Sequence, residues 1–126
     1  MHGTVLLLKS EGSWLAEVDV LRAKGLIVYA CDELEAAVQQ LQQVAPDVVV
    51  VMLSAAGGAS IVSALRGLVD HATSIIVTSG SEQREPALAA GADSFLLNSA
   101  EPADLAYEIH RALILRRSGR RVPWNW

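Results

Sequence analysis

Five short runs of aliphatic residues alternate with longer segments of mixed polarity along the chain. Each run is uninterrupted, as is typical of strands in a parallel sheet that is covered on both faces. The segments between them carry apolar residues at helical spacing. The predicted strands are 5–8, 26–29, 48–51, 75–77 and 95–97, and the predicted helices are 13–24, 33–44, 60–69, 86–90 and 102–117. Pro86 does not fit a helix interior, so we expect the fourth helix to begin there and to be short.

This strict alternation of strands and helices predicts a single α/β domain. Crossovers between parallel strands are right-handed, so the helices cover both faces of the sheet. Residues 1–117 therefore read as a doubly wound (βα)5 domain, and residues 118–126 read as a basic, tryptophan-containing tail. Functional residues of such folds gather beyond the carboxyl ends of the strands. Asp47 and Asp70 lie at the opposite edge and are set aside as catalytic candidates.

The composition narrows the class of protein further. The 126 residues are 52% hydrophobic and 19% charged, which is too apolar for a disordered chain. No apolar stretch reaches the roughly 18 residues that cross a bilayer, and the first residues lack the basic segment of a secretory signal. A lone cysteine, Cys31, excludes an intramolecular disulfide and fits a reducing compartment. We therefore expect a cytoplasmic protein with no membrane insertion.

The net charge of −4 is unevenly distributed along the chain. All 14 acidic residues and five of the ten basic residues lie in the first 110 positions, which carry −9, and the last sixteen residues carry +5. An acidic body argues against nucleic-acid binding by the domain. Only the arginine-containing tail offers such a contact, and it would be weak and sensitive to salt.

Three segments carry a family resemblance that covers about residues 4–116. Pro46-Asp47 leads into the third aliphatic run, Ala90-Gly91-Ala92-Asp93 precedes the fifth, and Glu101-Pro102 opens the last helix. Together they resemble the CheY-like receiver domains of response regulators, which belong to bacterial two-component signalling. The resemblance implies a flavodoxin-like, five-stranded parallel sheet with strand order 2-1-3-4-5.

In receiver domains, phosphoryl transfer depends on an acidic pair that holds Mg2+, a nucleophilic aspartate, a serine or threonine, and a lysine. Carried onto this chain, the acidic pair falls on Lys9 and Ser10, the nucleophile on Met52, the hydroxyl on Ser79 and the lysine on Asn98. Only Ser79 keeps the required group. A thioether cannot serve as the phosphoryl acceptor, and a lysine stands where a metal ligand should be. The resemblance thus implies a degenerate pocket with no catalytic residue, no metal and no cofactor.

We expect no other set of catalytic or metal-binding residues at the strand ends. The sequence has no Ser-His-Asp set, metal-ligand cluster or pair of acid–base carboxylates there, and its histidines stand in no cobalamin-binding motif. We therefore expect no enzymatic activity and a role in phosphorylation-independent protein binding instead. In receiver-like folds, the face of the fourth helix, fifth strand and fifth helix commonly mediates dimerisation. Here it would expose Ala103, Tyr107, His110 and Ile114.

The tail adds Trp124 and Trp126, which either fold back onto the domain or anchor an interface. The expected partner is a protein: a sensor kinase, another regulator or a second copy of this chain. Two alternatives remain open. One is a sensor of a small ligand or anion that uses the pocket of Lys9, Ser79 and Asn98, and the other is nucleic-acid binding through the tail.

Overall fold

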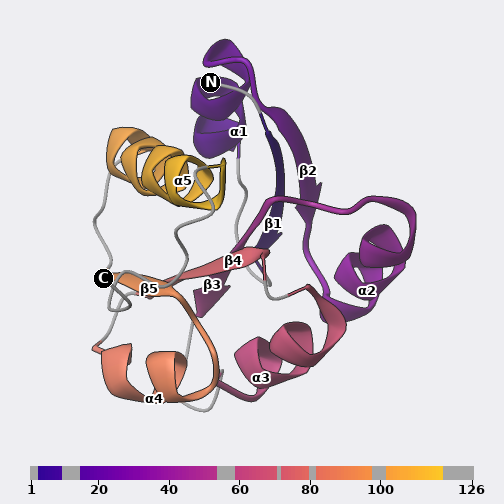
Figure 1. Ribbon diagram of the computed structural model, residues 1–126, viewed down its shortest axis with the longest axis vertical. Helices are drawn as coiled ribbons and strands as arrows, with labels where there is room; N and C mark the ends of the chain where they lie inside the picture. Colours follow the sequence, from indigo (N-terminus) through magenta and orange to yellow (C-terminus); the bar gives the residue numbers. More distant parts are fainter. Residues whose placement is uncertain are drawn as a thin grey trace.

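The computed structural model describes residues 3–9, 15–53, 59–70, 72–79, 82–97 and 102–117. Five strands form one parallel sheet in the order β2-β1-β3-β4-β5, which confirms the predicted fold class and strand order (Figure 1). The strands are β1 (Thr4–Lys9), β2 (Ile27–Cys31), β3 (Val48–Leu53), β4 (Ser74–Ser79) and β5 (Ser94–Leu97). The helices are α1 (Leu15–Ala23), α2 (Leu34–Gln43), α3 (Ala59–Leu68), α4 (Arg84–Ala89) and α5 (Pro102–Arg117). None of the helices in these described ranges is long and apolar enough to cross a membrane.

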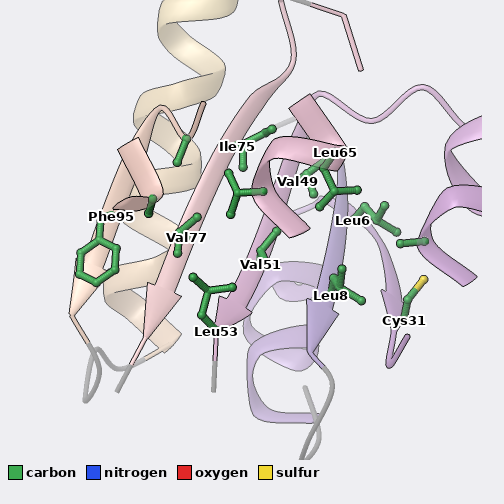
Figure 2. Packing of buried hydrophobic residues seen from close by; sticks show 14 residues of the cluster. Leu6, Leu8, Cys31, Val49, Val51, Leu53, Leu65, Ile75, Val77 and Phe95 are labelled. Atoms are coloured by element: carbon green, nitrogen blue, oxygen red, sulfur yellow. The ribbon is translucent and has the colours of Figure 1, made fainter. Parts of the chain in front are cut away.

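The helices cover the sheet from both sides. α1 and α5 pack against each other on one face, and α2, α3 and α4 cover the other (Figure 1). Side chains alternate along each strand, so each face has its own apolar cluster. Val50 and Ile76 lie in the cluster beneath α1 and α5. Val51 and Val77 lie in the cluster beneath α2, α3 and α4, which Figure 2 shows along β1, β3, β4 and β5.

Helices α1 and α4 end in the same way, at a glycine in the left-handed region. Gly25 has φ 91° and Gly91 has φ 117°. The amide of the residue after each glycine reaches back five residues, from Leu26 to the Leu21 carbonyl and from Ala92 to the Ala87 carbonyl. Glycine adopts this backbone conformation without steric cost, and the bonds satisfy carbonyls that the helix leaves free. Both glycines therefore set the direction in which the chain enters the next strand.

The predicted start of the fourth helix was wrong by two residues. α4 begins at Arg84 and has six residues, so Pro86 lies inside its first turn. The first amide groups of a helix have no partner within it, and a proline ring is tolerated there for that reason. The helix is short, as predicted, and it ends at Ala89.

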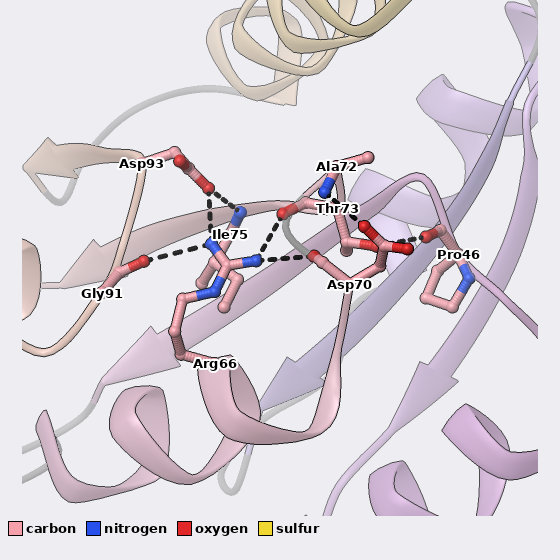
Figure 3. Close-up of polar contacts among 8 residues, drawn as sticks. All are labelled: Pro46, Arg66, Asp70, Ala72, Thr73, Ile75, Gly91 and Asp93. Atoms are coloured by element: carbon pink, nitrogen blue, oxygen red, sulfur yellow. Dashed lines mark hydrogen bonds and ion pairs between the residues drawn. The ribbon is translucent and has the colours of Figure 1, made fainter. Parts of the chain in front are cut away.

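Arg66 of α3 joins several segments at the amino-terminal edge of the sheet (Figure 3). Its Nη1 donates to the Asp93 carboxylate at 3.1 Å and to the Gly91 carbonyl at 3.3 Å. Its Nη2 donates to the carbonyls of Asp70 at 2.9 Å and Thr73 at 2.7 Å. A planar guanidinium can serve four acceptors at once because its donors point in fixed directions. Arg66 thereby fastens α3 to the connections that precede β4 and β5.

The two aspartates set aside above also lie at this edge, away from the strand ends that carry the site. The Asp47 carboxylate accepts a hydrogen bond from the Thr4 amide at 2.9 Å. The Asp70 carboxylate accepts one from the Ala72 amide at 2.7 Å. Both side chains hold backbone at the start of a strand, which is a structural role.

Candidate functional site

Met52 lies at the carboxyl end of β3, the central strand of the sheet. Its register partners are Lys9 in β1 and Thr78 in β4. The side chain is partly buried and packs against the apolar cluster beneath α1 and α5. The position at which the resemblance places a nucleophilic aspartate therefore holds an uncharged thioether, which is only a weak hydrogen-bond acceptor.

The hydroxyl at the register position next to Met52 belongs to Thr78, the residue before the predicted Ser79. Because side chains alternate along β4, Thr78 shares the face of Met52, while Ser79 points to the opposite face. Ser79 is the register partner of Leu53, whose side chain lies in the cluster beneath α2, α3 and α4. There the Ser79 hydroxyl accepts a hydrogen bond from Gln83 Nε2 at 2.8 Å. Ser79 thus helps to attach the start of α4 to β4.

Thr78 is a buried polar residue in an apolar environment. It is 6% exposed, and its Oγ1 has no hydrogen-bond partner within the described part of the chain. Its register partners, Met52 and Leu96, both carry apolar side chains. A buried hydroxyl left without a partner costs about 1–3 kcal/mol, so most buried polar groups are paired. The sequence could have pointed to Thr78 only through the register of β4 against β3.

The remaining residues of the predicted pocket are only partly described. The backbone of Lys9 pairs with β3 beside Met52, and its side chain lies outside what the structure describes. Ser10 and Asn98 also lie outside the described residues. Among the side chains that are described, no group of three or more His, Cys, Asp or Glu is placed to hold a metal ion. The described centre of the site is therefore a thioether next to a hydroxyl.

Phe95 of β5 is held inward next to the start of α4. Its side chain is buried, and the guanidinium carbon of Arg84 lies 5.1 Å from the ring centroid. Arg84 Nη1 also donates to the Phe95 carbonyl at 3.5 Å. A guanidinium at this distance attracts the electron-rich face of the ring. This pair joins α4 to β5 at the edge of the sheet.

The outer side of α5 is a second candidate site. Ala103, Tyr107, His110 and Ile114 recur at helical spacing, and all four are exposed. Tyr107 is 64% exposed and Ile114 is 51% exposed. The structure therefore places the four predicted interface residues together on one side of the helix. Trp124 and Trp126 lie outside the described residues.

Exposed apolar side chains also occur on the two elements at the β5 edge of the sheet. Leu97 of β5 and Leu88 of α4 are both exposed. α4 and α5 lie on opposite sides of the β5 edge (Figure 1). Exposed leucine, isoleucine and tyrosine side chains that gather on one side of a small protein often mark an interaction site. We call this surface, formed by Leu88, Leu97, Tyr107 and Ile114, the α4–β5–α5 face.

No protein-family model and no curated protein matches the chain, whereas many solved structures match its fold. NtrX from Brucella abortus, in complex with ADP, superposes with a TM-score of 0.79 at 20% identity, over 98% of this chain and 30% of that one. CheY4 of Vibrio cholerae, a chemotaxis response regulator, gives 0.77 at 20% identity, over 89% and 99%. A CheY-like receiver domain protein from Methanospirillum hungatei gives 0.82 at 16% identity, over 94% and 99%. The chain thus spans under a third of NtrX, and its fold is the receiver-domain fold of response regulators.

Proposed function

We propose that this chain is a cytoplasmic, atypical receiver of two-component signalling that takes no phosphoryl group on β3 and acts by binding another protein. The observation behind the absence of phosphorylation in this proposal is Met52 near the end of β3. Acceptance of a phosphoryl group there requires an oxygen nucleophile, and a thioether has none. In the sequence, Lys9 and Ser10 stand where an acidic pair would bind Mg2+, which prefers carboxylate oxygens. The proposal includes no catalytic activity.

The α4–β5–α5 face is the proposed contact surface, and a second copy of this chain is the proposed partner. On α5, the face presents the side chains of Tyr107 and Ile114, which are both exposed and mainly apolar. α5 carries Asp104 in its first turn and Arg111 about two turns later. In a two-fold dimer with antiparallel α5 helices, the acidic half of one helix lies against the basic half of the other. Arg111 also forms an ion pair with Glu108 of its own helix at 2.9 Å, so the apolar side chains carry most of the proposed contact.

The oligomeric state of the full chain tests this proposal. Sedimentation velocity over a range of concentrations is expected to show a monomer–dimer equilibrium, and Tyr107→Glu is expected to shift it to the monomer. Leu68→Glu is the control, because Leu68 is a similarly exposed apolar residue on α3, outside the face. Deleting residues 118–126 measures what Trp124 and Trp126 contribute. A wild-type monomer at all concentrations, or equal loss of the dimer in Leu68→Glu, would contradict a second copy as the partner.

A further inference from the structure

Met52 and Thr78 form an unusual pair on the α1 and α5 face of the sheet. They are register partners on adjacent parallel strands, which run about 4.8 Å apart. The Thr78 hydroxyl has no partner in the described part of the chain, and the thioether sulfur does not serve as its acceptor. Met52 is only partly buried, so part of this residue is exposed to solvent. A polarizable thioether on a partly exposed residue thus lies at the register position next to a buried donor.

We propose that Met52 is a redox modification site, at which a peroxide converts the thioether to a sulfoxide that accepts the hydrogen bond Thr78 lacks. In the reaction, the sulfur lone pair forms a bond to one peroxide oxygen, and the O–O bond breaks. The departing hydroxide takes the proton of the transferred oxygen and leaves as water. The sulfur is oxidised by two electrons and the peroxide is reduced by two.

Sulfoxidation ordinarily disrupts apolar packing, because it places a polar group among apolar ones. Here a donor is already in place beside the sulfur, on the neighbouring strand. The oxidised chain should therefore keep its fold and gain a hydrogen bond between β3 and β4. The inference goes beyond the proposed protein binding and does not rest on it, since mass and thermal stability are its readouts.

The test uses the full chain treated with hydrogen peroxide. Peptide mass spectrometry separates oxidation at Met52 from oxidation at Met1, the only other methionine. The melting temperature is then compared between oxidised and reduced protein for the wild type, Thr78→Val and Ser79→Ala. We expect oxidation to lower the melting temperature at least about 3 °C more in Thr78→Val than in the wild type, because only the variant leaves the sulfoxide without its donor. Ser79→Ala, which removes a hydroxyl on the opposite face, should behave as the wild type.

Thr78→Ala is the second variant should Thr78→Val fold poorly, and Met52→Leu controls for oxidation elsewhere, including at Cys31. Two results would overturn the proposal. One is oxidation of Met52 in the folded chain more than about a hundredfold slower than in the denatured chain, which would mean that the sulfur is reached only by unfolding. The other is an equal loss of melting temperature in the wild type and in Thr78→Val.

Discussion

Met52 and Thr78 are register partners at the carboxyl ends of β3 and β4, and the buried Thr78 hydroxyl has no hydrogen-bond partner among the described residues. The pair occupies the centre of the edge at which receiver-like chemistry is expected. In place of a carboxylate it presents a thioether, so the described part of this centre is uncharged. Because the Thr78 hydroxyl is buried without a partner among the described residues, substitutions at this pair have measurable effects on the free energy of unfolding.

Thr78→Val is expected to stabilise the protein by about 1 kcal/mol. The substitution replaces a buried hydroxyl that has no partner with a methyl group of similar size, and it removes the cost of desolvating the hydroxyl. Ser79→Ala is the matched control one residue along the strand, and it should destabilise by about 1 kcal/mol because it deletes the hydrogen bond from Gln83. Urea unfolding of the two variants measures both values. A loss of stability in Thr78→Val would show that its hydroxyl is satisfied in solution.

Gly91→Ala is expected to destabilise the protein by about 2 kcal/mol or more. Gly91 has φ 117°, and a Cβ there would lie 2.7 Å from Cγ of Arg66, so the substitution adds a steric clash to an unfavourable backbone conformation. Gly67→Ala, on α3, provides the control. A Cβ at Gly67 meets nothing within 4 Å, and alanine favours a helix interior by about 0.5–1 kcal/mol. Thermal or urea unfolding should therefore give opposite signs for the two glycines, and equal signs would contradict the described packing of Arg66 on Gly91.

The free energy of unfolding should fall at alkaline pH because the Cys31 thiol ionises more readily in the unfolded chain. Burial, and secondly the charge of the adjacent Asp32, raise the pKa of the Cys31 thiol above its ordinary value of 9.0. The unfolded chain then loses the thiol proton at a lower pH than the folded chain. The free energy of unfolding is therefore unaffected by this group well below pH 9 and decreases as the pH rises from there through the folded pKa. In Cys31→Ala this decrease is absent, so the difference between the two pH profiles should be flat near neutrality and slope only above about pH 9.

If the difference in free energy of unfolding between the wild type and Cys31→Ala did not change with pH, the Cys31 thiol would have the same pKa in the folded and unfolded states. Alkylation by iodoacetamide gives a second readout, since the thiolate is the reactive form. The folded chain should react more slowly than the denatured chain at the same pH, and equal rates would contradict a buried thiol.

The strands and the layering of the fold could be predicted from the sequence because they depend on local pattern. Uninterrupted aliphatic runs such as 48–51 indicate a buried strand even when the predicted ends are wrong by one or two residues. By contrast, an error of one residue changes which hydroxyl is expected beside Met52. Thr78 and Ser79 are adjacent, and one step along a strand changes the face of the sheet, so only pairing with β3 shows which of them lies beside Met52.

The role of Arg66 could not be predicted for a different reason. Three of its four acceptors are backbone carbonyls, which every residue carries and which leave no pattern in the sequence. They converge only after α3, β4 and the connection to β5 have packed together. The start of α4 was missed because Pro86 marks the first turn of a helix without fixing which residue of that turn it occupies.

The most direct test of the central claim is an amide NMR titration of the full chain, first with Mg2+ and then with beryllofluoride, which mimics a phosphoryl group. The account predicts no saturable change in chemical shift at Met52 or Thr78, because β3 ends in a thioether and the sequence provides no acidic pair after β1. Saturable shifts that centre on these two residues would contradict it, since they would show that this edge of the sheet still binds a metal and a phosphoryl group.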